Sequence, residues 1–584
     1  RINTILQSAF FKLTGIIPEE QAIDLMKAAA KATYGRKGDD IVQKNWAAID
    51  AGAKQVVEIQ VPESWKDAAD EGLHMTHAEN GREDVVDFVN NIQSKVNAQE
   101  GNSLPVSAFK DYVDGTTPSG SSAYEKRGIA VNIPVWQPEN CIQCNRCAYV
   151  CPHAVIRPVA LTEEEAANAP EGMTTLPMTG MKDYKFAITV SAYDCTGCGS
   201  CANVCPGKKG AKALAMENME ANAGVQKFFD YGVELPVKED VVAKFKETTV
   251  KGSQFKQPLL EFSGACAGCG ETPYAKLITQ LFGDRMYIAN ATGCSSIWGN
   301  SSPSTPYTVN AKGQGPAWGN SLFEDNAEFG YGMLLAQKAI RDGLKEKVED
   351  LVANAENEDV KAAGQEWLDT FSVGATNGTA TDKLVAALEA CGCEKAQEIL
   401  AQKDFLSKKS QWIFGGDGWA YDIGFGGVDH VLASGRDINV MVFDTEVYSN
   451  TGGQSSKSTP TGAIAQFAAG GKEVKKKDMA SIAMSYGYVY VAQISMGADF
   501  NQTVKAIAEA EAYPGPSLII AYAPCINHGI KKGMSKAQTE EELAVKCGYW
   551  HNFRFNPAAE NKFTLDSKAP NMDDYQAFLD GEVR

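Results

Sequence analysis

Continuous hydrophobic runs alternate with amphipathic stretches over the second half of the chain. The runs QWIFGG, INVMVFD and PSLIIAYA are almost wholly apolar, which is the pattern of strands covered on both faces of a parallel sheet. Helical patterns and Gly-rich turns separate these runs, so residues 256–560 are predicted to form a parallel α/β domain. Within this domain, the charged helical stretch 330–405 is predicted to be an insertion on the sheet.

The first half of the chain predicts smaller units. Residues 1–118 combine polar helical stretches with the strand-like run VVEIQVP, so an α/β segment is expected there. The stretch DGTTPSGSSAYEKRG has the composition of a linker, and a cysteine-rich region follows at 119–255. In that region, Thr162 and Glu165 fit a helix capping box. Residues 561–584 are expected to form an extended polar C-terminal tail.

Length and charge narrow the class of protein. With 584 residues the chain is too long for one hydrophobic core. The net charge of −18 disfavours nucleic acid or an anionic membrane as a partner. No apolar run approaches the ~18 residues that cross a bilayer, and no secretory pattern opens the chain, so we expect a soluble, cytoplasmic protein. Because the sequence starts without Met and within a helical pattern, we also expect it to be part of a longer chain.

Two cysteine runs repeat one spacing. CIQCNRCAYVCP begins at Cys141 and CTGCGSCANVCP at Cys195, and both read C-x2-C-x2-C-x3-C-P, the spacing of bacterial two-cluster ferredoxins. Three cysteines of each run reach one cluster and the fourth reaches the other. The predicted 4Fe–4S ligand sets are Cys141, Cys144, Cys147 and Cys205, and Cys195, Cys198, Cys201 and Cys151. Structural zinc is the alternative, although zinc sites usually pair two C-x2-C knuckles.

Glycines and oxygen ligands follow two of the predicted strands. QWIFGG leads into Gly416-Asp417-Gly418, and INVMVFD leads into TEVYSNTGGQSS. The carboxyl ends of parallel strands share one edge, where ligands bind, and a helix beginning there offers free N–H groups to a phosphate. Asp417, the Thr445 hydroxyl and a backbone carbonyl near Val447 could supply oxygen ligands to Mg²⁺. Alone, GDG could equally be a structural turn.

These motifs resemble those of pyruvate:ferredoxin (flavodoxin) oxidoreductase. The resemblance rests on TEVYSNTGGQSSKSTPTGA, on GNSLFEDNAEFGYGM (319–333) and on CAGCGETPYAKL (266–277), and it matches the carboxy-terminal part of the enzyme along nearly the whole chain. Thr445 departs from the general thiamine-diphosphate pattern, which has Asn there. The fold implied is a multidomain α/β protein, with a thiamine-diphosphate-binding parallel-sheet domain plus a two-cluster ferredoxin-like α+β domain.

The resemblance also implies roles for residues that spacing does not explain. Cys266, Cys269, Cys294 and Cys525 would bind a third 4Fe–4S cluster, although zinc or unrelated thiols fit their spacing equally well. Asn450 and Glu271 would be catalytic. Asn3 and Asn45, in a segment related to part of the coenzyme A region, would contact coenzyme A, although capping or turn roles suit them as well. The implied thiamine diphosphate contacts are Glu271, Cys294, Gly416, Asp417, Gly418, Trp419, Thr445, Glu446, Val447, Tyr448, Ser449 and Asn450.

The family's reaction is the oxidative decarboxylation of pyruvate with coenzyme A to acetyl-CoA and CO2. Electrons pass from thiamine diphosphate through three 4Fe–4S clusters to ferredoxin or flavodoxin. The resemblance thus implies thiamine diphosphate, Mg²⁺, coenzyme A and a homodimer. No pyrimidine domain is recognisable, so the pyruvate-binding groups are expected in amino-terminal domains outside this sequence, and this part alone is expected to turn over pyruvate poorly. The alternatives are a non-catalytic electron-transfer subunit and an oxidoreductase for another 2-oxo acid.

A few residues remain outside these assignments. Cys391, Cys393 and Cys547 are expected to be free thiols, and the run KEVKKK (472–477) is expected to be a solvated face. His153 and His528 follow predicted ligands closely, and either a structural role or tuning of a cluster suits them.

Overall fold

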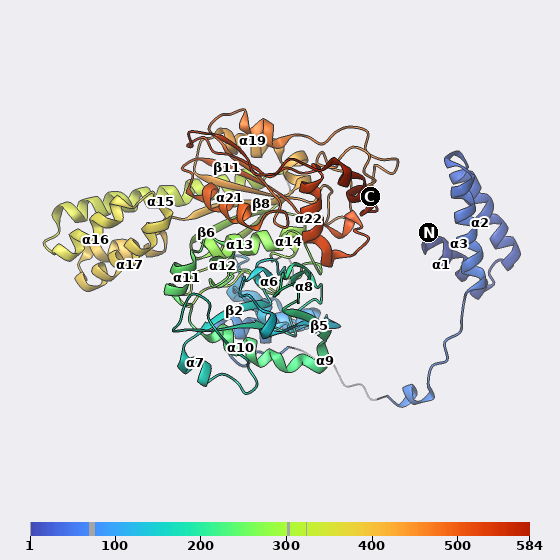
Figure 1. Ribbon diagram of the computed structural model, residues 1–584, viewed down its shortest axis with the longest axis horizontal. Helices are drawn as coiled ribbons and strands as arrows, with labels where there is room; N and C mark the ends of the chain where they lie inside the picture. The colour runs from blue at the N-terminus through green and yellow to red at the C-terminus, as the bar shows by residue number, and fades with distance from the viewer. Residues whose placement is uncertain (1, 69–75, 301–303, 323) are drawn as a thin grey trace. The chain divides into compact units, whose positions relative to one another are not determined.

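The computed structural model describes residues 2–68, 76–300, 304–322 and 324–584 (Figure 1). The chain divides into two compact units, residues 1–74 and 75–584. The stretch 319–333 includes one position, Phe323, that lies outside the described residues. Among the described residues, no helix is both long enough and apolar enough to cross a bilayer.

The first unit is helical rather than α/β. It contains α1 (Ile2–Thr14), α2 (Glu19–Tyr34) and α3 (Asp39–Lys54), and α1 crosses α3 so closely that a Cβ added to Gly52 would lie 2.2 Å from the Ile5 carbonyl oxygen. The run VVEIQVP forms no strand, and Val57 and Ile59 are exposed. The prediction of an α/β segment is therefore wrong here, because no other segment among residues 2–68 is extended to pair with this run.

Residues 76–118 belong to the second unit, so the predicted boundary at 118 is also wrong. They contain α4 (Glu83–Phe88) and α5 (Ser94–Asn97), joined by a π-helical turn. The expected linker that follows is packed into the unit. The Thr305 N–H donates to the buried Ser121 hydroxyl at 2.9 Å, and the Ser122 hydroxyl donates to the Glu261 carbonyl at 3.0 Å. Small polar side chains let this stretch satisfy its hydrogen bonds inside the fold.

The cysteine-rich region has two small antiparallel sheets. β1 (Asn132–Trp136) pairs with β5 (Leu214–Asn218), and β2 (Ile156–Leu161), β4 (Lys185–Val190) and β3 (Leu176–Pro177) form the other sheet. The predicted capping box of Thr162 and Glu165 is present at the start of α7 (Glu163–Ala167). The other helices here are α6 (Arg146–Tyr149), α8 (Ser200–Val204), α9 (Met219–Asn222), α10 (Gln226–Glu234), α11 (Glu239–Phe245) and α12 (Val250–Ser253).

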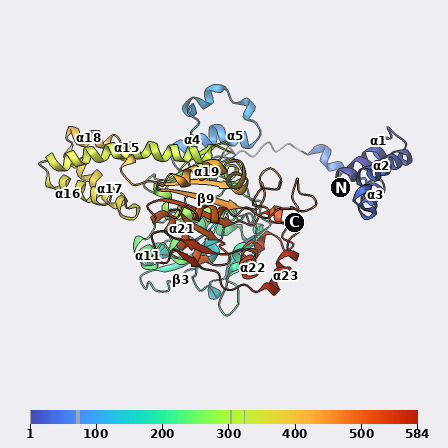
Figure 2. The ribbon, with the colours of Figure 1, turned by 90° about the horizontal axis from the view of Figure 1, so that it is seen from above.

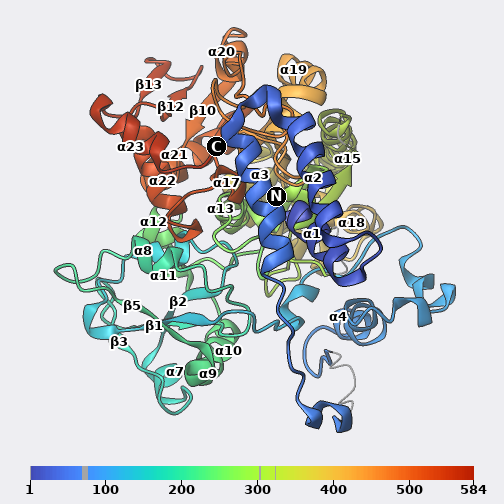
Figure 3. The same cartoon turned by 90° about the vertical axis from the view of Figure 1, so that its right-hand side faces the viewer.

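The predicted parallel sheet is confirmed and has the strand order β13-β12-β10-β11-β9-β8-β6-β7. Six strands are parallel, and β12 and β13 add an antiparallel edge (Figure 3). Apolar cores cover both faces, which explains the continuous hydrophobic runs. The strands are β6 (Met286–Ala291), β7 (Ala317–Ser321), β8 (Ser410–Gly416), β9 (Ile438–Asp444), β10 (Tyr490–Ile494), β11 (Pro516–Tyr522), β12 (Phe553–Phe555) and β13 (Phe563–Leu565).

Helices surround this sheet, and the predicted helical insertion extends away from it (Figure 2). The insertion has a core of its own, in which Trp367 and Leu384 are fully buried. It consists of the long helix α15 (Asn326–Asn354) with α16 (Glu358–Asp369), α17 (Gly374–Cys391) and α18 (Glu394–Leu400). The other helices are α13 (Thr272–Phe282), α14 (Cys294–Ile297), α19 (Phe425–Ala433), α20 (Met479–Met484), α21 (Phe500–Ala512), α22 (Ala537–Lys546) and α23 (Tyr575–Asp580).

The last residues are folded, which corrects the prediction of an extended tail at 561–584. β13 pairs with β12 at the sheet edge. In α23, Phe578 is buried and its ring lies 4.7 Å from that of Tyr549. The few apolar residues of this segment are spaced so that they pack on the hydrophobic surface of the domain. The mostly polar composition of the segment does not predict this packing.

Candidate functional site

The two strand ends singled out in the sequence do meet. β8 and β9 are parallel neighbours, with Gly416 opposite Phe443, so the residues that follow them lie at one edge of the sheet. The Thr445 hydroxyl donates to Asp417 Oδ1 at 3.0 Å and lies 3.0 Å from the Val447 carbonyl oxygen. The Thr445 hydroxyl thus contacts both of the other predicted Mg²⁺ ligands.

Their spacing fits the ion that they are predicted to hold. Oxygens on adjacent corners of an octahedron with Mg–O bonds of about 2.1 Å lie about 3 Å apart, which matches both oxygen–oxygen distances here. Asp417 is buried, and both burial and the neighbouring Asp444 raise its pKa. Because a divalent cation relieves such crowding of negative charge, this donor set suits Mg²⁺.

Sequence reasoning missed Ser456, whose hydroxyl donates to the second carboxylate oxygen of Asp417. Ser456 is buried and follows Asp444, the last residue of β9, by twelve positions in the Ser- and Gly-rich stretch SNTGGQSSKSTP. The only signal in the sequence was that small polar side chains cluster after a strand, and this signal does not single out one serine.

A π-helical turn, Gly418–Ile423, follows Asp417 directly and leads into α19. A Cβ on Gly418 would lie 2.5 Å from the Tyr448 ring, so glycine is required where these two strand-end loops touch. Trp419 is buried, and its indole Nε1 has no hydrogen-bond partner among the described residues. The N-terminal end of such a turn is suited to oxygen atoms of a ligand such as a diphosphate.

Residues Thr445 to Asn450 divide between the two sides of their loop. Thr445 and Val447 face Asp417, whereas Glu446 has a positive φ of 60° and carries its side chain elsewhere. Ser449 contacts a cysteine, as described below, and Asn450 is exposed. Glu446 can therefore offer only its backbone to a ligand beside Asp417. The catalytic role of Asn450 stays a prediction.

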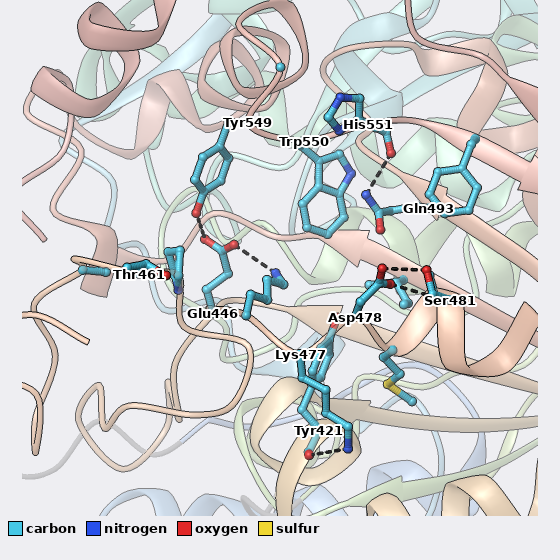
Figure 4. Close-up of a pocket in the computed structure, with 18 of the residues that line it drawn as sticks. Tyr421, Glu446, Thr461, Lys477, Asp478, Ser481, Gln493, Tyr549, Trp550 and His551 are labelled. Atoms are coloured by element: carbon cyan, nitrogen blue, oxygen red, sulfur yellow. Dashed lines mark hydrogen bonds and ion pairs between the residues drawn. The ribbon is translucent and has the colours of Figure 1, made fainter. Parts of the chain in front are cut away.

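Glu446 instead forms a buried charge cluster at a cavity of about 900 Å³ (Figure 4). Its carboxylate lies 2.9 Å from Lys476 Nζ and 2.7 Å from Arg584, and the Tyr549 hydroxyl donates to it at 2.8 Å. Burial alone would raise the pKa of Glu446, but Lys476 and Arg584 hold it at about 2. None of Asp417, Thr445 or the cysteines lines this cavity.

Lys476 corrects the interpretation of KEVKKK as a solvated face. Its ammonium pairs with the buried Asp444 at 2.7 Å and with Glu446. Burial lowers the pKa of Lys476, but Asp444 and Glu446 outweigh burial and raise it. Lys472 also donates to the carbonyls of Ser456 and Thr459. The run brings its cations to buried carboxylates and carbonyls that the local sequence does not reveal.

Cys266, Cys269, Cys294 and Cys525 converge although they lie on separate segments. Burial raises the pKa of the Cys525 thiol to about 11, and Cys266 also raises it. Burial is likewise the main cause of the raised pKa values of Cys269 and Cys294, and Cys525 contributes to both. Cys266 is exposed, and the other three cysteines are partly buried. The thiols of Cys269, Cys294 and Cys525, whose ionisation is disfavoured, would be stabilised as thiolates by a cationic iron–sulfur core.

This cysteine set touches the loop that carries Thr445. The Ser449 hydroxyl donates to Cys294 Sγ at 3.1 Å. The Asn527 amide donates to the Ser449 carbonyl at 3.2 Å and to Cys525 Sγ at 3.6 Å. The predicted diphosphate site and the predicted third cluster are therefore neighbours within one constellation.

Glu271 lies beside the third cysteine set. The Trp298 indole donates to its carboxylate at 2.8 Å, and burial raises the pKa of Glu271 to about 7. Glu271 also raises the pKa values of Cys269, Cys294 and Cys525, so it lies close to all three thiols. The imidazole Nε2 of His528 lies 2.7 Å from the Thr445 carbonyl oxygen, which favours a structural role for His528 beside the predicted Mg²⁺ ligands.

The cysteines of the ferredoxin-like region group as predicted, across the two runs. A cavity is lined by all four thiols of the first set, Cys141, Cys144, Cys147 and Cys205. In the second set, burial raises the pKa of Cys195 to about 12, and Cys151 from the other run is the first thiol to raise it further. The crossed pairing of the fourth cysteines is the geometry that two 4Fe–4S clusters need.

Structural zinc is the alternative for these cysteines. Among the described residues, no three His, Cys, Asp or Glu side chains lie close enough together to form a site for one metal ion. Tetrahedral zinc binds its ligands to a single ion, whereas a cubane takes one thiolate at each of its four irons. Cys391, Cys393 and Cys547 join none of these sets. The first two touch each other at 2.7 Å, and Cys547 is buried within the core.

The two residues predicted to contact coenzyme A are in the first unit. Asn3 is exposed on α1, whereas Asn45 is buried in α3 and its amide donates to the Ile41 carbonyl at 2.8 Å. This back-bond within the helix is a structural role, so only Asn3 presents its side chain freely. The prediction of a coenzyme A site at these two residues stays a prediction.

Comparison with known families matches three segments. Residues 370–521 match the thiamine pyrophosphate enzyme C-terminal TPP-binding domain, and residues 140–209 match a 4Fe-4S dicluster domain. Residues 76–130 match a domain of unknown function named EKR. The chain therefore carries a thiamine-diphosphate-binding domain and a two-cluster 4Fe–4S domain, at the positions where the structure assembles the oxygen and cysteine ligands.

Relatives match over the whole chain. It is 55% identical to a pyruvate-flavodoxin oxidoreductase of Enterobacter agglomerans, covering 100% of this chain and 50% of the relative. It is 52% identical to that of Klebsiella pneumoniae, covering 100% of this chain and 49% of the relative. It is 53% identical to the pyruvate:ferredoxin oxidoreductase of Moorella thermoacetica, covering 100% of this chain and 50% of the relative. The chain thus spans about half the length of these relatives, and over that half it is similar to pyruvate:ferredoxin (flavodoxin) oxidoreductases.

Proposed function

We propose that this chain is the cofactor and electron-relay part of an enzyme that oxidatively decarboxylates pyruvate. The products would be acetyl-CoA, CO2 and two electrons, with coenzyme A as co-substrate and ferredoxin or flavodoxin as acceptor. The carrying observation is the contact between the Thr445–Asn450 loop and the third cysteine set, through Ser449 and Cys294. A donor held at Asp417 would be next to the first carrier of a relay.

Within this proposal each group of residues has one task. Asp417, Thr445 and the Val447 carbonyl would hold Mg²⁺ against the diphosphate, and Trp419 Nε1 would face the ligand. Bound thiamine diphosphate supplies the carbanion stabilisation that decarboxylation of a 2-oxo acid needs. The protein keeps the carboxylates of Asp417 and Glu271 away from water, since both side chains are buried. Cys266, Cys269, Cys294 and Cys525 would pass single electrons toward the ferredoxin-like pair.

Two contacts support a relay between the proposed third cluster and the ferredoxin-like region. The loop that carries Cys266 and Cys269 meets the ferredoxin-like region, because the backbone N–H of Gly268 contacts the Cys198 thiol. The His153 imidazole, two residues after Cys151, lies 3.1 Å from the Ser263 carbonyl oxygen. The third set and the second ferredoxin-type set are therefore adjacent, as transfer in series requires.

The pyruvate-binding groups and the pyrimidine-facing acid would be contributed by parts of the protein outside this chain, as would much of a dimer interface. A non-catalytic electron carrier is the alternative, because the 4Fe-4S dicluster domain alone supports it. The intact oxygen set at Asp417 and Thr445 favours the enzyme, since an electron carrier has no use for it.

Calorimetric titration with thiamine diphosphate separates these alternatives. The enzyme proposal expects saturable binding by this chain with Mg²⁺ and much weaker binding with EDTA. The full-length protein should then reduce a viologen dye with pyruvate and coenzyme A faster than with 2-oxoglutarate. If thiamine diphosphate does not bind in a Mg²⁺-dependent way, the non-catalytic electron carrier is the correct function. If the full-length protein prefers 2-oxoglutarate, the proposed substrate is wrong.

A further inference from the structure

Lys276 is a buried cation for which the fold supplies no carboxylate. It lies in α13 with 2% of its surface exposed, and its Nζ donates to the backbone carbonyls of Ala148 and Tyr149. Among the residues that the structure describes, no ion pair includes Lys276. A buried ammonium without a counter-anion costs several kcal/mol, so an anion is to be expected nearby.

The position of the ammonium indicates which anion it serves. Ala148 and Tyr149 lie between Cys147, a predicted ligand of the first ferredoxin-type cluster, and Cys151, a predicted ligand of the second. Burial lowers the pKa of Lys276 to about 8, and the two thiols that oppose this effect are Cys151 and Cys147. The ammonium thus contacts the backbone segment that joins a predicted ligand of one set to a predicted ligand of the other.

Two other cations of this region do not replace Lys276. Arg157 is paired with the Glu261 carboxylate, which offsets its charge. Lys251 lies near Cys144 and Cys141 but is only half-buried, with its Nζ 4.0 Å from the centre of the Phe245 ring. Of these three cations, Lys276 is therefore the one that has no carboxylate partner and whose charge is least screened by solvent.

The helix that carries Lys276 connects the two electron-transfer regions. α13 begins directly after Cys269 and Glu271, and Lys276 follows one turn later. In Figure 1, α13 lies between the strands of the large sheet and α6 of the ferredoxin-like region. A rigid helix thus fixes the ammonium relative to both the third cysteine set and the ferredoxin-type pair.

We propose that Lys276 is the built-in countercharge of the ferredoxin-type clusters and raises the reduction potential of one or both. A 4Fe–4S core with four thiolates is anionic and gains a further negative charge on reduction, and local charge is one of the factors that set its potential. A fixed cation between two such clusters stabilises their reduced forms. Electrons from the third cluster would therefore move toward the pair. The inference depends on the dicluster ligand sets and does not depend on which 2-oxo acid is used.

The test is an EPR-monitored redox titration of the purified holoenzyme. Lys276→Met removes the charge and keeps the length, Lys276→Gln keeps hydrogen-bond donors without charge, and Lys276→Arg keeps the charge. The two neutral variants should make reduction of at least one ferredoxin-type cluster tenfold or more less favourable, about 59 mV per one-electron couple. Lys276→Arg should stay close to the wild type.

Lys251→Met is the matched control, because it removes a cation near the first cluster that is half exposed. Its shift should be smaller and limited to that cluster. Unchanged potentials in Lys276→Gln at full iron content, or a shift in Lys251→Met as large as that in Lys276→Met, would overturn the proposal. If both neutral variants lose iron while Lys276→Arg retains it, the requirement for a cation is supported.

Discussion

In the ferredoxin-like region, all eight predicted cluster ligands lie between Cys141 and Cys205 in two copies of one motif. At the edge of the large sheet, by contrast, the ligands come from segments as distant as Cys266 and Cys525. The first region assembles its ligands locally, with one crossed cysteine per run. The second depends on the correct arrangement of β6, β8, β9 and β11, whose ends carry or precede its ligands. Damage to the sheet should therefore affect the thiamine site and the third cluster before the ferredoxin-type pair.

The largest expected effect comes from removing one ligand of the third set. Cys525→Ala should lower iron from about twelve to about eight per chain, because a cubane with three thiolates is poorly held. The EPR signals of the ferredoxin-type pair should persist, while pyruvate-dependent dye reduction by the full-length enzyme should be lost. Cys547→Ala, which alters a buried thiol outside every ligand set, is the control. Retention of twelve irons by Cys525→Ala would show that the third set is wrong.

The next effect separates the two ligand types at the sheet edge. Asp417→Asn should weaken Mg²⁺-dependent thiamine diphosphate binding by about 100-fold or more, because it removes the anionic ligand from a buried site. Iron content should not change, since the cysteines keep their contacts. Titration calorimetry measures the first effect and iron assay the second. Asp429→Asn, which alters a carboxylate bonded to Tyr486, is the control. Equal affinities in the two variants would remove Asp417 from the site.

A buried carboxyl should make the stability of the sheet domain dependent on pH. Burial raises the pKa of Glu541 to about 8 from a usual 4.5. The folded protein thus keeps a proton that the unfolded chain loses, so stability falls as pH rises from about 4.5 through 8. Between pH 6 and 8.5 the loss should be on the order of 3 kcal/mol.

Glu541→Gln should remove this dependence. Over the same pH range, the wild-type Tm should fall by roughly 3 to 5 °C more than that of the variant, as measured by scanning calorimetry. Glu542→Gln, which changes the exposed neighbour, should follow the wild type. Parallel curves for wild type and Glu541→Gln would contradict the burial argument.

The smallest effect is expected at Thr445. Thr445→Val keeps the shape of the side chain and removes the hydroxyl that bridges Asp417 and the Val447 carbonyl. Affinity for thiamine diphosphate with Mg²⁺ should fall about tenfold, or about 1.4 kcal/mol, because one neutral ligand is lost while Asp417 remains. A loss as large as that of Asp417→Asn would mean that the hydroxyl, and not the carboxylate, dominates binding.

The sequence predicted those parts of the fold whose signal is local. The continuous apolar runs of β8, β9 and β11 and the capping box at Thr162 are examples, and the structure confirms these strands and this cap. The crossed cysteine sets also come from local spacing. Their thiols lie near one another, and their role as cluster ligands stays a prediction. The prediction of a strand at VVEIQVP was wrong. Its alternation of apolar and polar residues is typical of a strand, yet no segment among residues 2–68 pairs with it. The prediction of an extended tail at residues 561–584 was wrong because a few apolar side chains anchor this mostly polar segment.

The site shows the same limit. Asp417, Thr445 and Val447 were found because two strand ends of a parallel sheet must meet at one edge. Ser456 and Lys476 were missed, because a serine among serines and a lysine among lysines acquire a role only through burial beside Asp417 and Asp444. Composition alone assigned Lys476 to solvent, and tertiary contacts reversed that assignment.

The most direct test of the central claim is anomalous diffraction at the iron edge from crystals grown with Mg²⁺ and thiamine diphosphate. We expect iron density within each of the two ferredoxin-type cysteine sets. We expect a third iron peak enclosed by Cys266, Cys269, Cys294 and Cys525, next to a metal-bound diphosphate that contacts Asp417 and Thr445. Zinc or no metal at those four sulfurs, or diphosphate density elsewhere, would contradict the account.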